Sequence, residues 1–209
     1  MKKAHKLTVE EIEEAIREAG SDSLSVFGGK FEGGVNCQIT PDELAGCLKA
    51  IIDSGHRIAA YLEIGVAAGG TTAMVHRFLK PETIVLVDDN KHAKAPLRPQ
   101  VLQGIDIREI IGRSDDEASV EAAAASGPYD LILIDGDHLY PGVKLDTVLY
   151  SPMLNKGGFL MFHDSALPEW GVVRIVRELR KDPGFEFVGE YVSPSIPRPL
   201  GTALFRRCA

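Results

Sequence analysis

Several features that would place a chain in a specialised class are missing from this sequence. It has only three cysteines, Cys37, Cys47 and Cys208, which are widely spaced and form no C-x-x-C pair. We therefore expect free thiols in a reducing compartment. No apolar run approaches the ~20 residues that cross a membrane. The basic residues at the N-terminus have no apolar segment behind them, so we expect no secretory signal. These absences favour a cytoplasmic protein that does not enter membranes.

The sequence also lacks an excess of positive charge. Its 209 residues include 23 Lys and Arg against 30 Asp and Glu, a net charge of −7. Sequence-independent nucleic-acid binding rests on neutralising phosphates with Lys and Arg, so we expect a small-molecule partner instead. With 44% hydrophobic residues, the chain is long enough for one sizeable core and short for two.

What is present is a strand, a glycine turn and a helix within residues 61–72, YLEIGVAAGGTT. The glycines allow a close approach of the backbone, and the unpaired N–H groups of the first helical turn face a ligand there. About twenty residues later a second strand ends in Asp88 and Asp89, where a carboxylate can hold the hydroxyls of a ribose. Together these features predict a nucleoside-containing cofactor.

Two common nucleotide motifs do not fit this turn. In the dinucleotide pattern G-x-G-x-x-G the second glycine admits a pyrophosphate, but Ala67 stands at that position here. No Gly-Lys-Ser/Thr follows, which excludes a P-loop. The turn instead has Glu63 two residues before Gly65, giving E-x-G-x-x-x-G-G-T. An ordinary strand-to-helix turn that needs glycine for its dihedral angles is the simpler alternative.

This pattern resembles the first motif of the class I S-adenosylmethionine-dependent methyltransferases. The later segment DLILIDGDHLYPGVKLDTVLYSPMLNKGGFLMFHDS is similar to the methyltransferase family 24-like subfamily, which includes antibiotic and macrolide-sugar tailoring O-methyltransferases. The resemblance covers roughly residues 38–207. It implies an acid and glycines around the amino-acid end of the cofactor, an acid on the ribose and a contact to the adenine edge. The cofactor-binding positions so implied are Glu63, Gly65, Val66, Gly69, Thr71, Asp88, Asp89, Ser114, Asp115 and Asp135.

Strand-like and helix-like segments alternate from residue 58 onward, which predicts a parallel sheet with helices on both faces. The expected strands span about 58–64, 83–88, 106–111, 130–135 and 157–163, and the expected helices about 71–80, 115–126, 141–154 and 168–181. Two further strands, FEFVGEYVS and TALFRR, follow without a helix between them. We therefore expect a Rossmann-like α/β fold, the class I methyltransferase fold, with a seven-stranded, mostly parallel sheet whose last strand is antiparallel.

Two amphipathic helices precede the sheet, so residues 1–57 form a helical extension of the core at 58–209. In the first, over residues 8–19, Thr8 and Glu11 form a capping box. In the second, Thr40 and Glu43 form another, with Pro41 at the first helical position. Residues 21–36 between them are a lid or a loop. In relatives such extensions cover the substrate or build a dimer, so the sequence is consistent with a homo-oligomer and does not require one.

Acidic and imidazole side chains follow the fourth and fifth strands. The fourth ends IDGDH, with Asp135, Asp137 and His138, and the fifth ends FHDS, with His163 and Asp164. Neighbouring parallel strands bring these groups together, where three carboxylates need protonation, partners or a cation. A divalent metal meets that need. The alternative is that Asp137 caps the next helix and His163 hydrogen-bonds locally.

The resemblance implies that Asp135, His163 and Asp164 hold such a metal. Relatives have a carboxylate or another oxygen donor at the position of His163. Mg or Mn is the expected ion, and the imidazole leaves other transition metals open. Adjacent residues of a strand point to opposite faces, so both His163 and Asp164 can bind only if the strand has already ended at His163.

Methyl transfer requires alignment of an acceptor oxygen and removal of its proton. A divalent cation would orient the hydroxyl and lower its pKa. His138 is our candidate general base, acting beside Asp135, although a solvent-facing residue at a helix start is equally consistent with its position. Ser114 can likewise cap the helix expected at Asp115. Tyr140, Trp170 and Phe162 are candidates for the wall of the substrate pocket.

The sequence thus predicts an S-adenosylmethionine-dependent methyltransferase that transfers a methyl group to a small-molecule hydroxyl with the help of a metal. Two alternatives remain. The Asp and His cluster would also suit a metal-dependent hydrolase or oxygenase, and the cleft would also suit a non-catalytic nucleoside-binding module.

Overall fold

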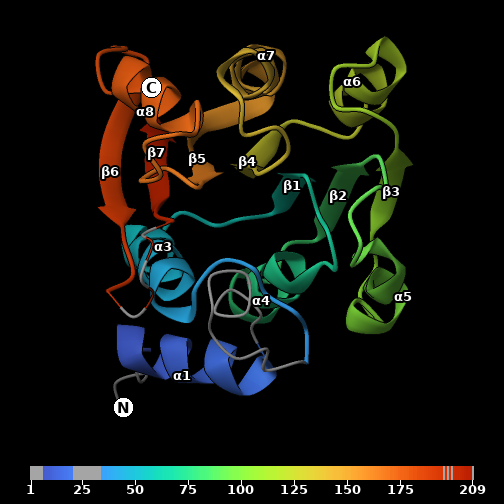
Figure 1. Cartoon of the computed structure of the whole chain (residues 1–209), viewed down its shortest axis with the longest axis vertical. Helices are drawn as coiled ribbons and strands as arrows, with labels where there is room; N and C mark the ends of the chain where they lie inside the picture. The colour runs from blue at the N-terminus through green and yellow to red at the C-terminus, as the bar shows by residue number, and fades with distance from the viewer. Residues whose placement is uncertain (1–6, 21–33, 195, 197, 199, 209) are drawn as a thin grey trace.

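A computed structural model describes residues 7–20, 34–194, 196, 198 and 200–208 of the chain. Figure 1 shows three layers, with a central sheet between two groups of helices. Helices α6, α7 and α8 cover one face of the sheet, and α1, α3, α4 and α5 cover the other. The expected lid at residues 21–36 lies mostly outside the described residues; only 34–36 are described.

The sheet contains seven strands in the order β3-β2-β1-β4-β5-β7-β6. Strand β7 is antiparallel to both of its neighbours, and the pairs among β1 to β5 are parallel. This confirms the predicted sheet and its inserted last strand. The strands are β1 Ala60–Ile64, β2 Thr83–Asp88, β3 Arg108–Ile111, β4 Tyr129–Ile134, β5 Leu154–His163, β6 Phe185–Tyr191 and β7 Thr202–Arg207.

The helices alternate with the strands as expected, with shifts at their ends. The bounds are α1 Val9–Ala19, α3 Pro41–Ser54, α4 Gly70–Leu79, α5 Arg98–Val101, α6 Glu117–Ala124, α7 Tyr140–Tyr150 and α8 Val172–Leu179, with 3₁₀ turns η1 Ala95–Leu97 and η2 Ser151–Met153. The helix expected over 141–154 ends at Tyr150 because the chain tightens into η2, where Pro152 stands. Strand β5 then begins at Leu154, three residues before its expected start.

The pleat of β1 divides the core into two clusters. Leu62 and Ile64 point into the cluster shared with α7 and α8, while Tyr61 points into the one shared with α1, α3 and α4. All three are at most 1% exposed, and full burial of a side chain of this size stabilises the fold by about 1.5–3 kcal/mol. Glu63 is two residues after Tyr61 in β1, so its side chain lies on the same face of the sheet. The strand that packs the core therefore also carries a buried carboxylate.

The first capping box is present. The Thr8 side chain accepts a hydrogen bond from the N–H of Glu11, and the Glu11 carboxylate accepts one from the N–H of Thr8. Gly20 follows the last residue of α1 as its cap.

The second capping box was predicted wrongly. Pro41 does open α3, but the side chain of Thr40 makes no capping hydrogen bond. The Glu43 carboxylate instead accepts from the N–H groups of Ser193 and Gly201, at 2.8 and 3.0 Å. A buried carboxylate is stabilised by such donors, and here they come from the connection between β6 and β7, about 150 residues further along the chain. Tertiary contact therefore replaces the local cap.

Among the described residues no cysteine forms a disulfide; Cys37 and Cys47 are buried and Cys208 is exposed. Among the described residues, no helix combines the length and the apolar character needed to cross a membrane.

Candidate functional site

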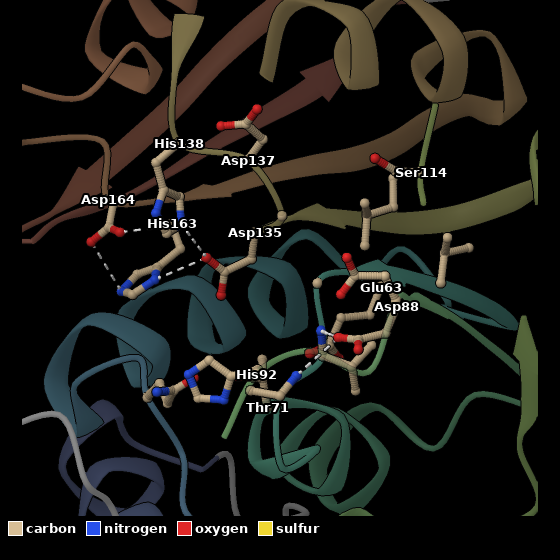
Figure 2. A pocket seen from close by; sticks show the side chains of 18 of the residues that line it. Glu63, Thr71, Asp88, His92, Ser114, Asp135, Asp137, His138, His163 and Asp164 are labelled. Carbon is tan, nitrogen blue, oxygen red and sulfur yellow. Dashed lines mark hydrogen bonds and ion pairs between the residues drawn. The ribbon is translucent and has the colours of Figure 1, made fainter. Parts of the chain in front are cut away.

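A cavity of about 610 Å³ opens at the carboxyl ends of the parallel strands. Every predicted cofactor-binding, catalytic and metal-binding residue except Gly69 lines it. Gly69 is the N-cap of α4 and has φ +85°, so its contribution is to the shape of the turn. Figure 2 shows the side chains around the cavity.

The glycine turn after β1 packs directly on the end of β4. Gly65 has φ +80°, and a Cβ at this residue would lie 2.2 Å from the carbonyl oxygen of Asp135. Both the left-handed backbone and the close contact require glycine. The glycine turn is therefore locked against the strand end that carries the acidic cluster.

Asp88, at the end of β2, holds this turn from the other side. Its Oδ2 accepts from the N–H groups of Val66 and Ala67, at 2.7 and 3.2 Å. Its Oδ1 accepts from the N–H of Asn90 at 2.7 Å. Ala67 has φ +48°, a conformation that costs free energy for a residue with a side chain and that these hydrogen bonds stabilise.

Arg98 clamps the glycine turn together with Asp88, and no pattern in the sequence predicted this role. It is 3% exposed. Its Nε and Nη2 donate to the carbonyl oxygen of Ala67 at 3.0 and 2.9 Å, and Nη2 lies 3.1 Å from Asp88 Oδ1. Nη1 donates to Asn90 and Glu109 at 2.8 and 3.0 Å. The guanidinium thus makes four hydrogen bonds and an ion pair with Asp88. Residue 67 is held by its N–H through Asp88 and by its carbonyl through Arg98.

Glu63 is 2% exposed and lines the base of the cavity. Its Oε2 accepts from the hydroxyl groups of Tyr61, at 2.7 Å, and of Thr72. Burial raises the pKa of Glu63 to about 8, and the charge of Asp135 adds to the rise against the opposing effect of those hydrogen bonds. The protonated, neutral carboxyl is therefore favoured at neutral pH in the ligand-free protein.

The other predicted cofactor residues lie at the rim of the cavity. Asp89 is exposed and pairs with Lys91 at 2.7 Å, and Asp115 pairs with Arg113 at 2.7 Å. Ser114 does not cap α6, because that helix begins at Glu117 and Asp116 is its N-cap. The side chain of Ser114 lies at the wall of the cavity instead (Figure 2).

Four side chains from the ends of β4 and β5 converge, as Figure 2 shows. Asp135 Oδ1 lies 3.2 Å from His163 Nδ1 and 3.3 Å from His138 Nε2. His138 Nε2 is also 3.3 Å from Asp164 Oδ2, and His163 Nε2 is 3.8 Å from Asp164 Oδ1. His138 is thus not a solvent-facing residue at a helix start. His163 does bond locally, to Asp135, and still belongs to the cluster.

The backbone explains how two adjacent residues face one site. Strand β5 ends at His163, and Asp164 has φ +58°. The left-handed residue reverses the alternation of the strand, so that both side chains turn toward Asp135. Such a conformation in a buried non-glycine residue is typical of functional sites.

Asp137 is the member of the predicted group that does not join the cluster. Its Oδ1 accepts from the N–H of Leu139 at 2.8 Å, and Figure 2 shows its side chain directed away from the other four. Asp137 does not cap the next helix either, because Leu139 is the N-cap of α7 and this helix has no side-chain capping hydrogen bond.

The charges of the four groups depend on one another. Burial raises the pKa of Asp135, but the neighbouring imidazoles of His163 and His138 outweigh it and hold this pKa well below its usual range. Burial lowers the pKa of His163, and the two carboxylates more than compensate, raising it to about 9. Likewise the net shift of the His138 pKa is upward, because its carboxylate neighbours outweigh burial. Without a ligand the opposite charges of Asp135 and His163 therefore favour one another, with Asp135 ionised and His163 protonated at neutral pH.

The donor set fits a divalent cation. Ligand atoms of Asp135, His138 and Asp164 lie within 4.8 Å of one another. Among the described residues, His163 Nε2 and Asp164 Oδ1 are buried and have no hydrogen-bond partner. Buried polar atoms without partners are costly, and metal coordination would satisfy them. His138 therefore stands beside His163 as a potential ligand.

Comparison with known proteins identifies the fold and its chemistry. A family model described as a methyltransferase domain matches residues 62–165, about half of the chain, from β1 to just beyond the end of β5. The chain is a class I S-adenosylmethionine-dependent methyltransferase. An uncharacterized protein, R132 of Acanthamoeba polyphaga mimivirus, is 28% identical over 117 residues, which are 53% of each chain. The chain thus spans about half the length of this curated relative.

Two solved structures of methyltransferases have the same fold. The O-methyltransferase TomG of Streptomyces achromogenes, which is involved in tomaymycin synthesis and was solved with S-adenosylmethionine, has a TM-score of 0.66 and 15% identity over 94% of this chain and 90% of its own. An O-methyltransferase from Bacillus cereus, solved with S-adenosylhomocysteine, has a TM-score of 0.64 and 13% identity over 99% and 93%.

The walls of the methyltransferase cavity contain further residues. Trp170 lines the cavity beside His138, with ring centroids 5.0 Å apart. Phe162 is fully buried in the core and does not line it, which corrects one expectation, and Tyr140 donates to Glu178 outside it. His92 also lines the cavity, and its Nδ1 accepts from the N–H of Lys94 at 3.2 Å. No motif in the sequence distinguishes His92, because its position depends on the course of a loop.

Proposed function

We propose that this methyltransferase transfers a methyl group from S-adenosylmethionine to a hydroxyl group of a small molecule, with a divalent cation held at the ends of β4 and β5. The observation that carries the proposal is the convergence of Asp135, His138, His163 and Asp164 at one end of the cavity, while the glycine turn and Asp88 line another part of it.

The chain's own residues divide into two functions. The turn at residues 65–70, clamped by Asp88 and Arg98, is shaped before any ligand arrives, which lowers the entropic cost of binding the cofactor. S-adenosylmethionine supplies a methyl group on a sulfonium, which is electrophilic without further activation. The protein must then align the acceptor oxygen with that carbon, and good alignment accounts for a large part of the rate.

Asp135, His163 and Asp164 are assigned as the groups that hold the cation, which leaves His138 Nε2 for the proton of the acceptor. The cation would supply a positive charge that orients the acceptor hydroxyl and lowers its pKa. The two carboxylates suit Mg or Mn, and the imidazole admits other transition metals.

His138 is assigned as the general base. Its Nε2 points into the cluster, and its neutral form would take the hydroxyl proton as the new O–C bond forms. The two carboxylates that raise its pKa would favour the protonated product. The Trp170 ring lies beside the imidazole, tilted by 58° with ring centroids 5.0 Å apart.

The proposal is tested by incubating the full chain with S-adenosylmethionine, Mg²⁺ or Mn²⁺ and a panel of catechol, sugar and polyketide hydroxyl acceptors, with product detected by mass spectrometry. We expect methyl ethers whose formation stops on chelation. A methylated amine as the only product would contradict O-methylation. Turnover of an acceptor in the presence of metal and the absence of S-adenosylmethionine would indicate a different metal-dependent reaction.

A further inference from the structure

One side chain at the cavity is buried with an acceptor atom that has no partner. Asn36 is 6% exposed and lines the cavity. Its Nδ2 donates to the carbonyl oxygen of Gly34 at 2.9 Å, which fixes the orientation of the amide. Among the described residues, Oδ1 has no hydrogen-bond partner. Because polar atoms in protein interiors are almost always paired, a ligand donor is the natural partner of this oxygen.

The segment that carries Asn36 is held firmly across the N-terminus of α4. The N–H of Val35 donates to Ala19 at 2.9 Å and that of Cys37 to Gly20 at 3.3 Å, which ties the segment to the end of α1. A Cβ on Gly70 would lie 2.5 Å from the nitrogen of Cys37, so only glycine lets the segment lie this close to the helix. Asn36 itself has φ +56°, a conformation that asparagine tolerates better than most residues.

The neighbouring groups define what would fit. Gly70 and Thr71, in the first turn of α4, also line the cavity, and the unpaired N–H groups of a helix N-terminus favour an anion. Asn36 Oδ1 is an acceptor and favours a donor, such as an ammonium group. An α-amino acid presents a carboxylate and an ammonium on one carbon, which matches these two neighbouring preferences.

We propose that Asn36 Oδ1 receives the ammonium group of the amino-acid part of S-adenosylmethionine, while the N-terminus of α4 receives its carboxylate. The inference rests on the proposed use of this cofactor and extends it to a residue outside the matched methyltransferase domain. The helical extension before β1 thereby contributes directly to cofactor recognition.

Glu63 does not make Asn36 redundant. Its carboxyl lies at the base of the cavity and favours the neutral form, with Oε2 already accepting from two hydroxyl groups. An amide oxygen needs no deprotonation to accept a hydrogen bond, so Asn36 serves as acceptor over the whole physiological pH range.

The test measures calorimetrically how three ligands bind to the wild-type protein and to Asn36→Gly, which removes the side chain and keeps the left-handed backbone accessible. S-adenosylhomocysteine has both charged groups, decarboxylated S-adenosylhomocysteine has only the ammonium, and methylthioadenosine has neither. We expect Asn36→Gly to weaken the binding of S-adenosylhomocysteine and of its decarboxylated form by about tenfold or more, as for a hydrogen bond to a charged group. The affinity for methylthioadenosine should stay within about twofold of the wild-type value. Asn36→Asp should bind S-adenosylhomocysteine at least as tightly as the wild type.

Two results would overturn the assignment. Equal weakening of all three ligands would mean that Asn36 only supports the fold of the cleft. Unchanged binding of the decarboxylated ligand would mean that Asn36 contacts the carboxylate or nothing. A wild-type protein that binds none of the three would instead refute the cofactor assignment itself, which separates the two failures.

Discussion

Asp88 Oδ2 accepts a hydrogen bond from the backbone N–H of Val66 at 2.7 Å, across 22 residues of sequence. The carboxylate that closes β2 is thereby bonded to the turn that leaves β1. The same side chain lines the cavity, so it both shapes the glycine turn and faces the proposed cofactor site. A carboxylate has about four acceptor sites, and Asp88 uses three of them for the N–H groups of Val66, Ala67 and Asn90. About one site therefore remains for a ribose hydroxyl.

Replacing this carboxylate tests the turn. In Asp88→Asn one oxygen becomes a donor that opposes either the N–H groups of the turn or the guanidinium of Arg98. We expect the Kd for S-adenosylhomocysteine to rise by about ten- to a hundredfold, measured by calorimetry. Glu82→Gln is the control, since Glu82 is exposed, pairs with Arg57 and does not line the cavity, and it should change the Kd less than threefold. Wild-type affinity in Asp88→Asn would contradict the role assigned to Asp88.

Arg98 is expected to act on cofactor binding more than on the chemical step. Lysine cannot supply five donors in one plane, so Arg98→Lys leaves the carbonyl of Ala67 poorly held. We expect KM for S-adenosylmethionine to rise about tenfold, with kcat at saturation within about threefold. Arg174→Lys, on the exposed face of α8, is the control and should change neither. A fall in kcat without a change in KM would show that Arg98 supports only the stability of the fold.

His138 is expected to act on the chemical step. His138→Gln removes the proton acceptor and keeps a side chain of similar size, so kcat should fall by about a hundred- to ten-thousandfold. The Kd for S-adenosylhomocysteine should stay within about threefold, because His138 lies outside the cofactor turn. The control is His76→Gln on α4, a half-buried position outside the cavity. A variant that keeps a tenth or more of wild-type kcat would exclude His138 as the general base.

Metal binding can be separated from catalysis by direct titration. We expect Mn²⁺ to bind to the ligand-free protein and Asp164→Asn to weaken it by about ten- to a hundredfold, measured by electron paramagnetic resonance of free Mn²⁺. Asp137→Asn is the matched control, since Asp137 bonds to Leu139 outside the cluster. Equal Mn²⁺ affinity in the wild type and in Asp164→Asn would refute the assigned site.

Glu63 makes the stability of the ligand-free protein depend on pH. Its pKa is raised from 4.5 to about 8 by burial, so the unfolded chain loses this proton before the folded protein does. The contribution of Glu63 to the free energy of unfolding is therefore fully present below about pH 4.5 and declines until about pH 8. Its size is on the order of 5 kcal/mol. In Glu63→Gln, which stays neutral, chemical denaturation at pH 5 and at pH 8 should give more similar free energies of unfolding. An unchanged difference between the two pH values would contradict the raised pKa.

Local sequence patterns predicted most of the fold of this chain. The alternation of apolar strands and amphipathic helices predicted the sheet, because each period reflects burial on one face or on both. The sequence also predicted that one cavity is lined by the glycine turn, Asp88 and the residues after β4 and β5. This prediction follows because parallel strands bring their carboxyl ends to the same edge of the sheet. These inferences need only residue type and spacing.

Other features depend on partners far away in the sequence. Glu43 appeared to complete a local capping box, yet its carboxylate bonds to Ser193 and Gly201. Arg98 stands in a proline-bearing loop with no periodicity, and its four partner residues are brought together only by the folded chain. The left-handed turn at Asp164 likewise decides that both it and His163 face Asp135.

The sequence by itself determined the topology, the kind of cofactor and which strand ends bear reactive groups. Only the tertiary structure decided which of those groups meet, that Asp137 turns away while His138 joins the cluster, and that Asn36 is buried over α4 with an unpaired oxygen. The physical reason is that strands and helices arise from local periodicity and burial. Hydrogen bonds and charge pairs in a site instead depend on distances of about 3 Å between residues that the sequence does not place side by side.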